Sequence, residues 1–110
     1  AGLNARLNNL QNTRFICGDV LQTFTADFVE AYGKPDVVIL DPPRAGTLIE
    51  IKKTIIKAAP SKIIYVSCNP VSLAFDLTML TNGYRVSQIQ PYDMFPHTHH
   101  VETVVLLEKQ

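Results

Sequence analysis

The sequence has no net charge, few cysteines and no long apolar run, and each of these absences excludes a class of protein. Ten basic and ten acidic residues cancel, so the strongly basic surface of many nucleic-acid-binding domains is absent. Two cysteines are too few for a disulfide scaffold or a four-cysteine zinc or iron–sulfur site. No apolar run approaches the ~18 residues of a membrane span, and no secretory signal opens the chain. We expect free thiols and a reducing compartment, the cytoplasm.

Short β-branched runs alternate with segments of helical periodicity, which is typical of an α/β protein with a parallel sheet and right-handed crossovers. Residues 2–12, 21–31 and 47–58 are expected to be helical, as is a segment from Pro70 to the Asn82-Gly83 stop. The expected strands are 14–17, 37–40, 62–67, 84–92 and 101–107. Because no helix separates the last two strands, they should pair antiparallel or skip a position in the sheet.

Polar residues follow three of the expected strands: Asp19, Asp41 and the Cys68-Asn69 pair. Ligands bind beyond the carboxyl ends of the strands in open α/β sheets, so we expect these residues at one edge of the sheet, which we call the rim. Asp19 and Asp41 are also ordinary helix caps or turn formers. The two prolines after Asp41 give that strand a rigid, extended exit.

Cys68 differs from a buried structural cysteine, the role that suits the mid-strand Cys17. It stands at a strand end, and Asn69 and Pro70 after it suit the cap and first position of a helix. The positive end of that helix would lower the pKa of the thiol and prepare a nucleophile.

The loop before the last strand contains three histidines within four positions, His97, His99 and His100. A metal site would need a suitable fourth ligand and supporting contacts, so hydrogen-bonded loop histidines are the preferred interpretation. Glu102 opens a strand of valine and leucine. It either points to solvent or faces the rim as a general base. The basic residues at positions 52, 53, 57 and 62 are read as a solvated helix face rather than an RNA-binding surface.

Four segments, in this order and spacing, resemble the motifs of RNA 5-methyluridine methyltransferases. They are Phe15–Asp19 (F-x-x-GD), Ile39–Gly46 (DPPR-x-G), Val66–Pro70 (SCNP) and Asp93–Val104 (DMFPHTxHxE). The likeness extends over essentially all 110 residues. It implies that residues 1–110 are the C-terminal portion of a Rossmann-like, S-adenosylmethionine-dependent catalytic domain. Such an enzyme methylates C5 of a uridine in ribosomal or transfer RNA.

The resemblance assigns roles by position. Cys68 matches the nucleophile and Glu102 the base, while Asp19 and Asp41 match positions that contact the cofactor. Weaker hypotheses place Arg44 on a phosphate or the base, and Asn69 or His100 on the edge of the uracil. No metal is implied.

Two departures from the family pattern bear on these expectations. Phe75 stands where the family often has arginine, so this chain lacks the guanidinium for the contact that this arginine makes. The glycine-rich cofactor loop and the acidic residue on the following strand have no counterpart, and in the family they precede the segment matched here. We therefore expect 110 residues alone to bind S-adenosylmethionine poorly and to be inactive.

The family sheet has the order 3-2-1-4-5-7-6, and this chain holds strands 3 to 7 of it. Without strands 1 and 2 the strand at 37–40 has a bare apolar edge. We expect it to pair with a second copy or with the strand at 14–17. Two other functions stay open: a DPP-type amino-methyltransferase without a cysteine nucleophile, and a non-catalytic RNA-binding or assembly module.

Overall fold

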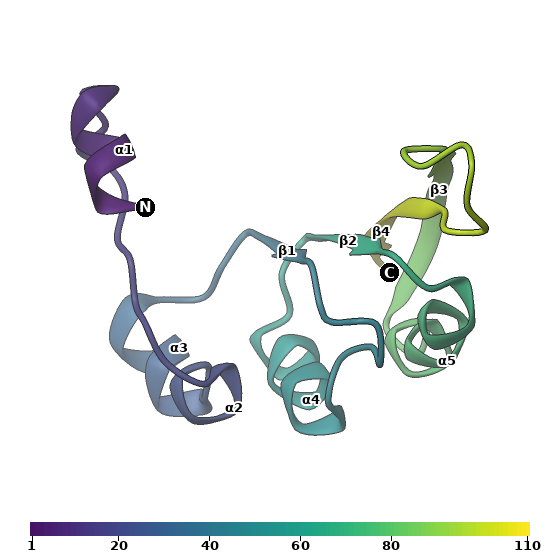
Figure 1. The fold of residues 1–110 in the computed structure, drawn as a ribbon. Helices are drawn as coiled ribbons and strands as arrows, with labels where there is room; N and C mark the ends of the chain where they lie inside the picture. Colours follow the sequence, from purple (N-terminus) through teal and green to yellow (C-terminus); the bar gives the residue numbers. More distant parts are fainter.

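The computed structural model describes all 110 residues, which form five helices and four strands (Figure 1). The helices are α1 (Gly2–Leu7), α2 (Val20–Thr23), α3 (Ala26–Tyr32), α4 (Ile49–Ala58) and α5 (Pro70–Leu80). The strands are β1 (Val37–Leu40), β2 (Lys62–Ser67), β3 (Tyr84–Tyr92) and β4 (Glu102–Lys109). From β1 onward every predicted strand and helix is present, with bounds that differ by a few residues.

The four strands form one mixed sheet in the order β1-β2-β4-β3. β1 and β2 are parallel and are joined through α4, whereas β4 runs antiparallel to both β2 and β3. The last two strands therefore pair antiparallel, as predicted, and β4 also inserts between β2 and β3. This order is the 4-5-7-6 half of the sheet that the resemblance implied.

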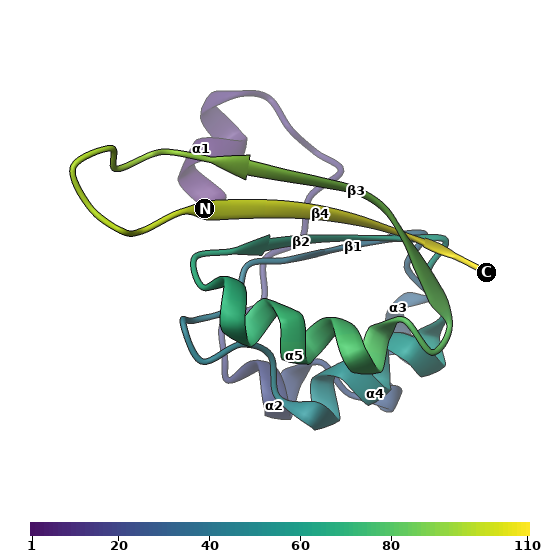
Figure 2. The same cartoon turned by 90° about the vertical axis from the view of Figure 1, so that its right-hand side faces the viewer.

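Helices α4 and α5 cover one face of the sheet and leave the other face open (Figure 2), while α2 and α3 lie beside α4, beyond the edge of β1 (Figure 1). Side chains that alternate along β2 and β4 are buried under the helices. The most buried of them are Ile63, Tyr65, Val105 and Leu107, which pack with Ile55 of α4 at zero or near-zero exposure. The core thus lies on one side of the sheet.

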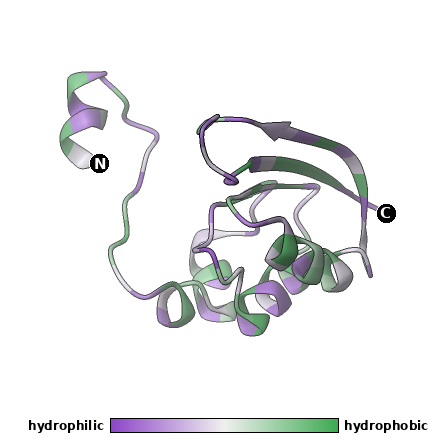
Figure 3. Ribbon diagram, turned by 45° about the vertical axis from the view of Figure 1, so that its right-hand side comes forward, coloured by the Kyte–Doolittle hydropathy of each residue, from purple (hydrophilic) through white to green (hydrophobic).

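The predicted strand at 14–17 does not form, and this expectation was wrong. Residues 10–19 run as an extended segment that separates α1 from the rest (Figure 3). Phe15 and Ile16 are about half exposed, at 53% and 48%. An isolated strand cannot satisfy its backbone groups by pairing, so the β-branched pattern alone does not make one here.

The predicted helix at 21–31 is divided into α2 and α3. Asp19 caps α2 by accepting from the Leu21 amide at 2.9 Å. Thr25 caps α3 by accepting from the Phe28 amide at 3.4 Å. The helix expected at 2–12 ends at Leu7.

The free edge of β1 carries exposed apolar side chains, with Ile39 at 68% and Val37 at 45%. Residues 14–17 have not moved beside it. Pairing with a second copy along this edge stays a prediction. None of the helices combines the length and apolar character that crossing a bilayer requires.

Candidate functional site

Two strand ends bring Cys68 and Glu102 to the same edge of the sheet. The antiparallel ladder between β2 and β4 closes with the pair Ser67 and Thr103. Cys68 is the residue after Ser67, and Glu102 is the residue before Thr103, so each lies one residue beyond the last β2–β4 pair. The end of β2 and the start of β4 lie at the same side of the molecule (Figure 2). Cys68 and Glu102 therefore lie at one edge of the sheet, and their roles in catalysis stay predictions.

A pocket of about 500 Å³ on the open face contains Asp41 and Glu102 together. The two carboxylates come from the end of β1 and the start of β4. The remaining lining residues are Val66, Tyr92, Met94, Phe95 and Val104. The pocket thus combines an apolar and aromatic wall with two carboxylates.

Sequence reasoning did not single out Tyr92, Met94 or Phe95 as pocket residues. All three are about half exposed or more, at 49%, 63% and 56%. Large apolar side chains left on the surface beside predicted polar residues were the available signal. The loop pattern alone does not show that their side chains face the same pocket as Glu102.

A second pocket of about 380 Å³ contains Asp19 and Asp41, the two predicted cofactor contacts. Its apolar lining includes Ile39, Leu48 and Ile51. Asp41 borders both pockets, so the two are neighbours at the carboxyl end of β1. Asp19 also caps α2, so it has a structural role here, and its contact with the cofactor stays a prediction.

The turn that carries Cys68 is held by its neighbours as the sequence predicted. The Asn69 side chain caps α5 by accepting from the Val71 amide at 3.0 Å, and Pro70 is the first residue of that helix. Ser67 Oγ donates to the Asn69 carbonyl at 2.8 Å and accepts from the Asn69 amide at 3.1 Å. Cys68 is half-buried beside the start of the helix, whereas Cys17 is exposed and not in a strand.

Asn69 and Arg44 link this turn to the loop after β1. Asn69 Nδ2 donates to the Arg44 carbonyl at 3.1 Å, so both ends of the Asn69 amide make structural contacts. Ser72 Oγ of α5 donates to the same carbonyl at 3.0 Å. The backbone of Arg44 is thereby attached to the first turn of α5.

The Arg44 side chain reaches the histidine loop, where its Nη1 lies 3.0 Å from His100 Nδ1. The ring of His99 lies beside that of His100, with centroids 4.4 Å apart. No group of three or more His, Cys, Asp or Glu side chains is arranged to hold a metal ion. The hydrogen-bond partner of His100 is the Arg44 guanidinium and not a metal ligand group.

A buried polar network lies behind the rim, centred on Asp76 of α5. Its carboxylate accepts from the Thr47 amide at 2.7 Å, from Lys52 Nζ at 2.5 Å and from the hydroxyl of Tyr65. The interpretation of Lys52 as part of a solvated face was wrong, because the side chain turns inward to this carboxylate and is 9% exposed. Burial, together with the hydrogen bond to Asp76, raises the pKa of Tyr65 above its usual range.

Gly46 lies against this network with φ at +89°. A Cβ there would stand 2.8 Å from Asp76 Oδ2 and 3.3 Å from the Cβ of Ser72. The glycine of the DPPR-x-G segment is therefore required both by its backbone conformation and by the close approach of the loop to α5.

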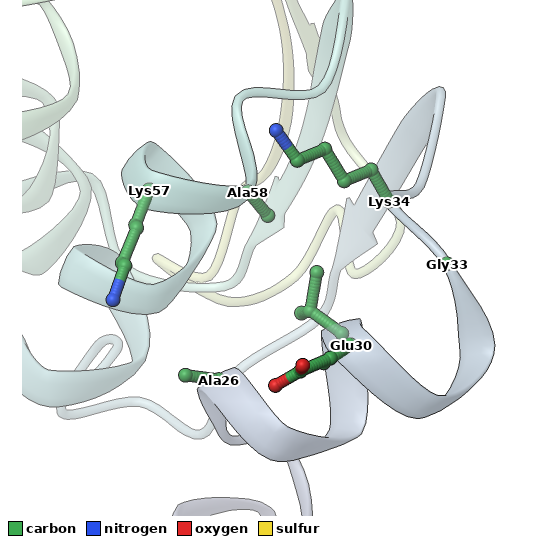
Figure 4. Close-up of a pocket in the computed structure, with 7 residues that line it drawn as sticks. Ala26, Glu30, Gly33, Lys34, Lys57 and Ala58 are labelled. Carbon is green, nitrogen blue, oxygen red and sulfur yellow. The ribbon is translucent and has the colours of Figure 1, made fainter.

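Another hollow lies between α3 and the end of α4, lined by Glu30, Lys34 and Lys57 among others (Figure 4). Gly33 and Lys34 precede β1, and Lys57 and Ala58 precede β2. It therefore opens at the amino ends of the parallel strands, opposite the rim, and contains none of the predicted site residues.

A profile of the tRNA (uracil-5-)-methyltransferase family matches residues 23–110. The chain belongs to this family. An RNA methyltransferase of Bacteroides thetaiotaomicron is 50% identical over 108 residues, which are 98% of this chain and 24% of that protein. One of Porphyromonas gingivalis is 52% identical over 109 residues, 97% of this chain and 23% of that protein. Both are named as uncharacterized RNA methyltransferases.

Among solved structures, the Pyrococcus abyssi tRNA (uracil-54, C5)-methyltransferase in complex with S-adenosyl-L-homocysteine matches with a TM-score of 0.80 and 38% identity. The match covers 96% of this chain and 24% of that one. This chain thus spans about a quarter of the length of the relatives it matches. Membership of the RNA uracil-C5 methyltransferase family, expected from four motifs, is confirmed.

Proposed function

We propose that this chain supplies the nucleophile and the base of an enzyme that methylates C5 of a uridine in RNA. The observation that carries the proposal is the placement of Cys68 and Glu102 on adjacent strand ends, next to a pocket that Glu102 shares with Asp41. The substrate is a uridine of ribosomal RNA, with transfer RNA as the alternative. The proposed compartment is the cytoplasm.

The chemistry requires the two residue types that the rim brings together. C5 of uracil is a weak nucleophile, so the Cys68 thiolate first adds to C6 and leaves electron density at C5. C5 then forms a bond to the methyl carbon, and the sulfonium of the donor leaves as a thioether. Glu102 removes the remaining proton from C5, the C6–S bond breaks, and the electron pair returns to the cysteine sulfur.

The methyl donor proposed for this reaction is S-adenosylmethionine. The pocket that contains Asp19 and Asp41 fits part of such a molecule, since it combines two carboxylates with an apolar lining. The carboxylates would accept hydrogen bonds from hydroxyl or amino groups, and Ile39, Leu48 and Ile51 would contact its apolar surface. The isolated 110 residues are proposed to bind it poorly.

The target base must leave its stack to reach the rim, at a cost of a few kcal/mol. The aromatic and methionine side chains of the rim pocket give an extruded pyrimidine an apolar surface on which to lie. Arg44 and His100 are proposed to contact the RNA backbone or the uracil edge from the neighbouring loop. Asn69 is proposed to assist mainly by holding that loop.

The test is covalent capture of RNA that carries 5-fluorouridine, because fluorine at C5 cannot be removed by the base and the adduct accumulates. A full-length enzyme that carries this chain should form an adduct in the presence of S-adenosylmethionine, visible as a mass increase and a band that survives denaturation. Cys68→Ala should abolish it. Cys17→Ala is the matched control and should leave capture unchanged, since Cys17 is exposed and lines neither of the two pockets.

The same experiment separates the two rival functions. An amino-methyltransferase would keep methyl transfer after Cys68→Ala, because an exocyclic amine needs no covalent activation. A non-catalytic RNA-binding module would retard RNA in a gel at physiological salt without any adduct. Either result would overturn the proposed reaction.

A further inference from the structure

We propose that Asp76 is a positioning residue for this reaction. Its buried carboxylate holds the loop of residues 41–48, which we call the DPPR loop, flat on α5 and so keeps Arg44 at His100 and beside the Cys68 turn. The effect on the reaction rests on the proposed function, whereas the effect on the loop does not.

One carboxylate joins four parts of the fold. Asp76 belongs to α5, and its three hydrogen-bond donors come from the DPPR loop (Thr47), from α4 (Lys52) and from β2 (Tyr65). Asp76 is 4% exposed and its salt bridge to Lys52 is almost completely enclosed. All three partners donate, so the position requires an anion that accepts at both oxygens. An asparagine would present its own N–H groups to donors.

The DPPR loop is attached to α5 at two points, one helical turn apart. Ser72 and Asn69 donate to the Arg44 carbonyl near the start of the helix. Asp76, four residues after Ser72, accepts from the Thr47 amide. Gly46 between them allows the loop to touch the helix, because any Cβ there would meet Asp76 and Ser72.

We call Asp76 and its three hydrogen-bond donors the clamp. The clamp acts on the rim only through the DPPR loop. Asp76 lines neither the pocket that contains Glu102 nor the pocket that contains Asp19. Release of Thr47 would free the loop from its second attachment and allow Arg44 to leave His100. Displacements of about 1 Å at a reacting site can lower a rate by about a hundredfold, so a buried residue behind the rim can control capture without touching RNA.

Three variants of the full-length enzyme separate positioning from charge burial. Asp76→Asn leaves the Lys52 ammonium unpaired in the interior. The double variant, Lys52→Met with Asp76→Asn, removes both charges, so that no unpaired charge stays buried. Glu108→Gln is the matched control, because it breaks an ion pair with Arg85 near the opposite ends of the strands. The Arg85 side chain is largely exposed and that of Glu108 is partly exposed, and neither belongs to the Asp76 network.

The first readout needs neither RNA nor a methyl donor. Arg44 is exposed, but its carbonyl is held by Asn69 and Ser72, so we expect trypsin to cleave after it mainly when the DPPR loop opens. Cleavage under native conditions is followed by mass spectrometry. We expect cleavage at this bond to be at least about tenfold faster in Asp76→Asn and in the double variant than in the wild type and in Glu108→Gln. Equal rates in the wild type and the double variant would overturn the clamp.

The second readout is the rate of 5-fluorouridine RNA capture at saturating RNA. We expect the double variant to be about ten- to a hundredfold slower while its melting temperature stays near that of the wild type. Wild-type capture by a double variant with an open loop would overturn the positioning role. Absence of capture in the wild type, with the loop still opened by the variants, would instead overturn the proposed function alone.

Tyr65→Phe keeps the proposal testable where the charge variants do not fold. It removes one donor to Asp76 and keeps both charges. Cleavage after Arg44 should then rise several-fold and capture should slow in the same direction. If a folded Tyr65→Phe enzyme shows neither change, the clamp is overturned.

Discussion

Arg44 Nη1 lies 3.0 Å from His100 Nδ1 and joins two segments that are 56 residues apart in the sequence. A guanidinium has no lone pair to offer, so it donates and the Nδ1 of His100 accepts. The proton of the neutral imidazole therefore resides on Nε2. The second ring nitrogen of His100, Nε2, is then a hydrogen-bond donor.

Replacement of Arg44 by alanine should remove the preference of His100 for the tautomer that carries its proton on Nε2. The contact to Nδ1 would be lost, and His100 would become a mixture of both neutral forms. The ¹⁵N shifts of the two ring nitrogens, measured by NMR on uniformly labelled protein, should move toward one another. His97 forms no hydrogen bond with Arg44 and serves as the internal reference. Unchanged His100 shifts in Arg44→Ala would show that the arginine does not select the tautomer.

Gly46 should tolerate no side chain. Gly46→Ala forces a Cβ to 2.8 Å from Asp76 Oδ2 and places alanine at a φ of +89°, so it combines a clash with backbone strain. Gly33→Ala is a matched control, because Gly33 has nearly the same φ, +90°, and nothing within 4 Å of the added carbon. Strain alone costs about 1–3 kcal/mol.

Denaturant unfolding should therefore rank the two alanine variants. Gly33→Ala should lower the free energy of unfolding by the cost of backbone strain alone. Gly46→Ala should lower it by clearly more, because the Asp76 carboxylate is held by three donors and cannot move aside without losing them. Equal losses in the two variants would show that the loop does not press on α5.

Tyr84 should make the fold sensitive to alkali. Burial raises the pKa of Tyr84 above its usual value of about 10, and its hydroxyl donates to the Pro60 carbonyl at 2.8 Å. The unfolded chain ionises this tyrosine first, so its contribution is complete below about pH 10 and falls as the pH rises toward the folded-state pKa. Tyr84→Phe should lose about 1 kcal/mol of stability at pH 7. The gap between the two proteins should shrink above pH 10, as followed by denaturant unfolding.

The part of the fold from β1 onward was predictable because its sequence is locally consistent. The continuous apolar runs of β1 and β2 and the Asn69-Pro70 start of α5 each give one answer at the level of pattern, cap and turn. The segment at 14–17 has the same kind of pattern but no neighbouring strand here. Its failure to form shows that strand propensity reports a fit to a sheet rather than an intrinsic backbone preference.

The candidate site was also predictable only in part. Cys68 and Asp41 could be placed at one rim because each follows a strand end. The orientation of Glu102 stayed open, because it depends on how the last strand pairs with β2. The inward turn of Lys52 could not be predicted, since a helical lysine beside Lys53 and Glu50 has the pattern of a solvated face. Its partner Asp76 is 24 residues away on another helix, and the pairing exists only after α4 and α5 pack on the sheet.

Glu102 should control the last step of the proposed reaction rather than the first. Glu102→Gln removes the carboxylate that accepts the C5 proton, while Cys68 on the adjacent strand end keeps its capped turn. With ordinary uridine RNA and S-adenosylmethionine, the variant should add the thiol, accept the methyl group and then stall. Methylated RNA attached to Cys68 should accumulate, detected by tryptic mass spectrometry, and turnover should fall by about 10²–10⁴-fold. Glu50→Gln, an exposed change on α4, is the control and should turn over normally. Normal product release by Glu102→Gln would assign the proton to another group, and Asp41, which shares the pocket, would be the next candidate.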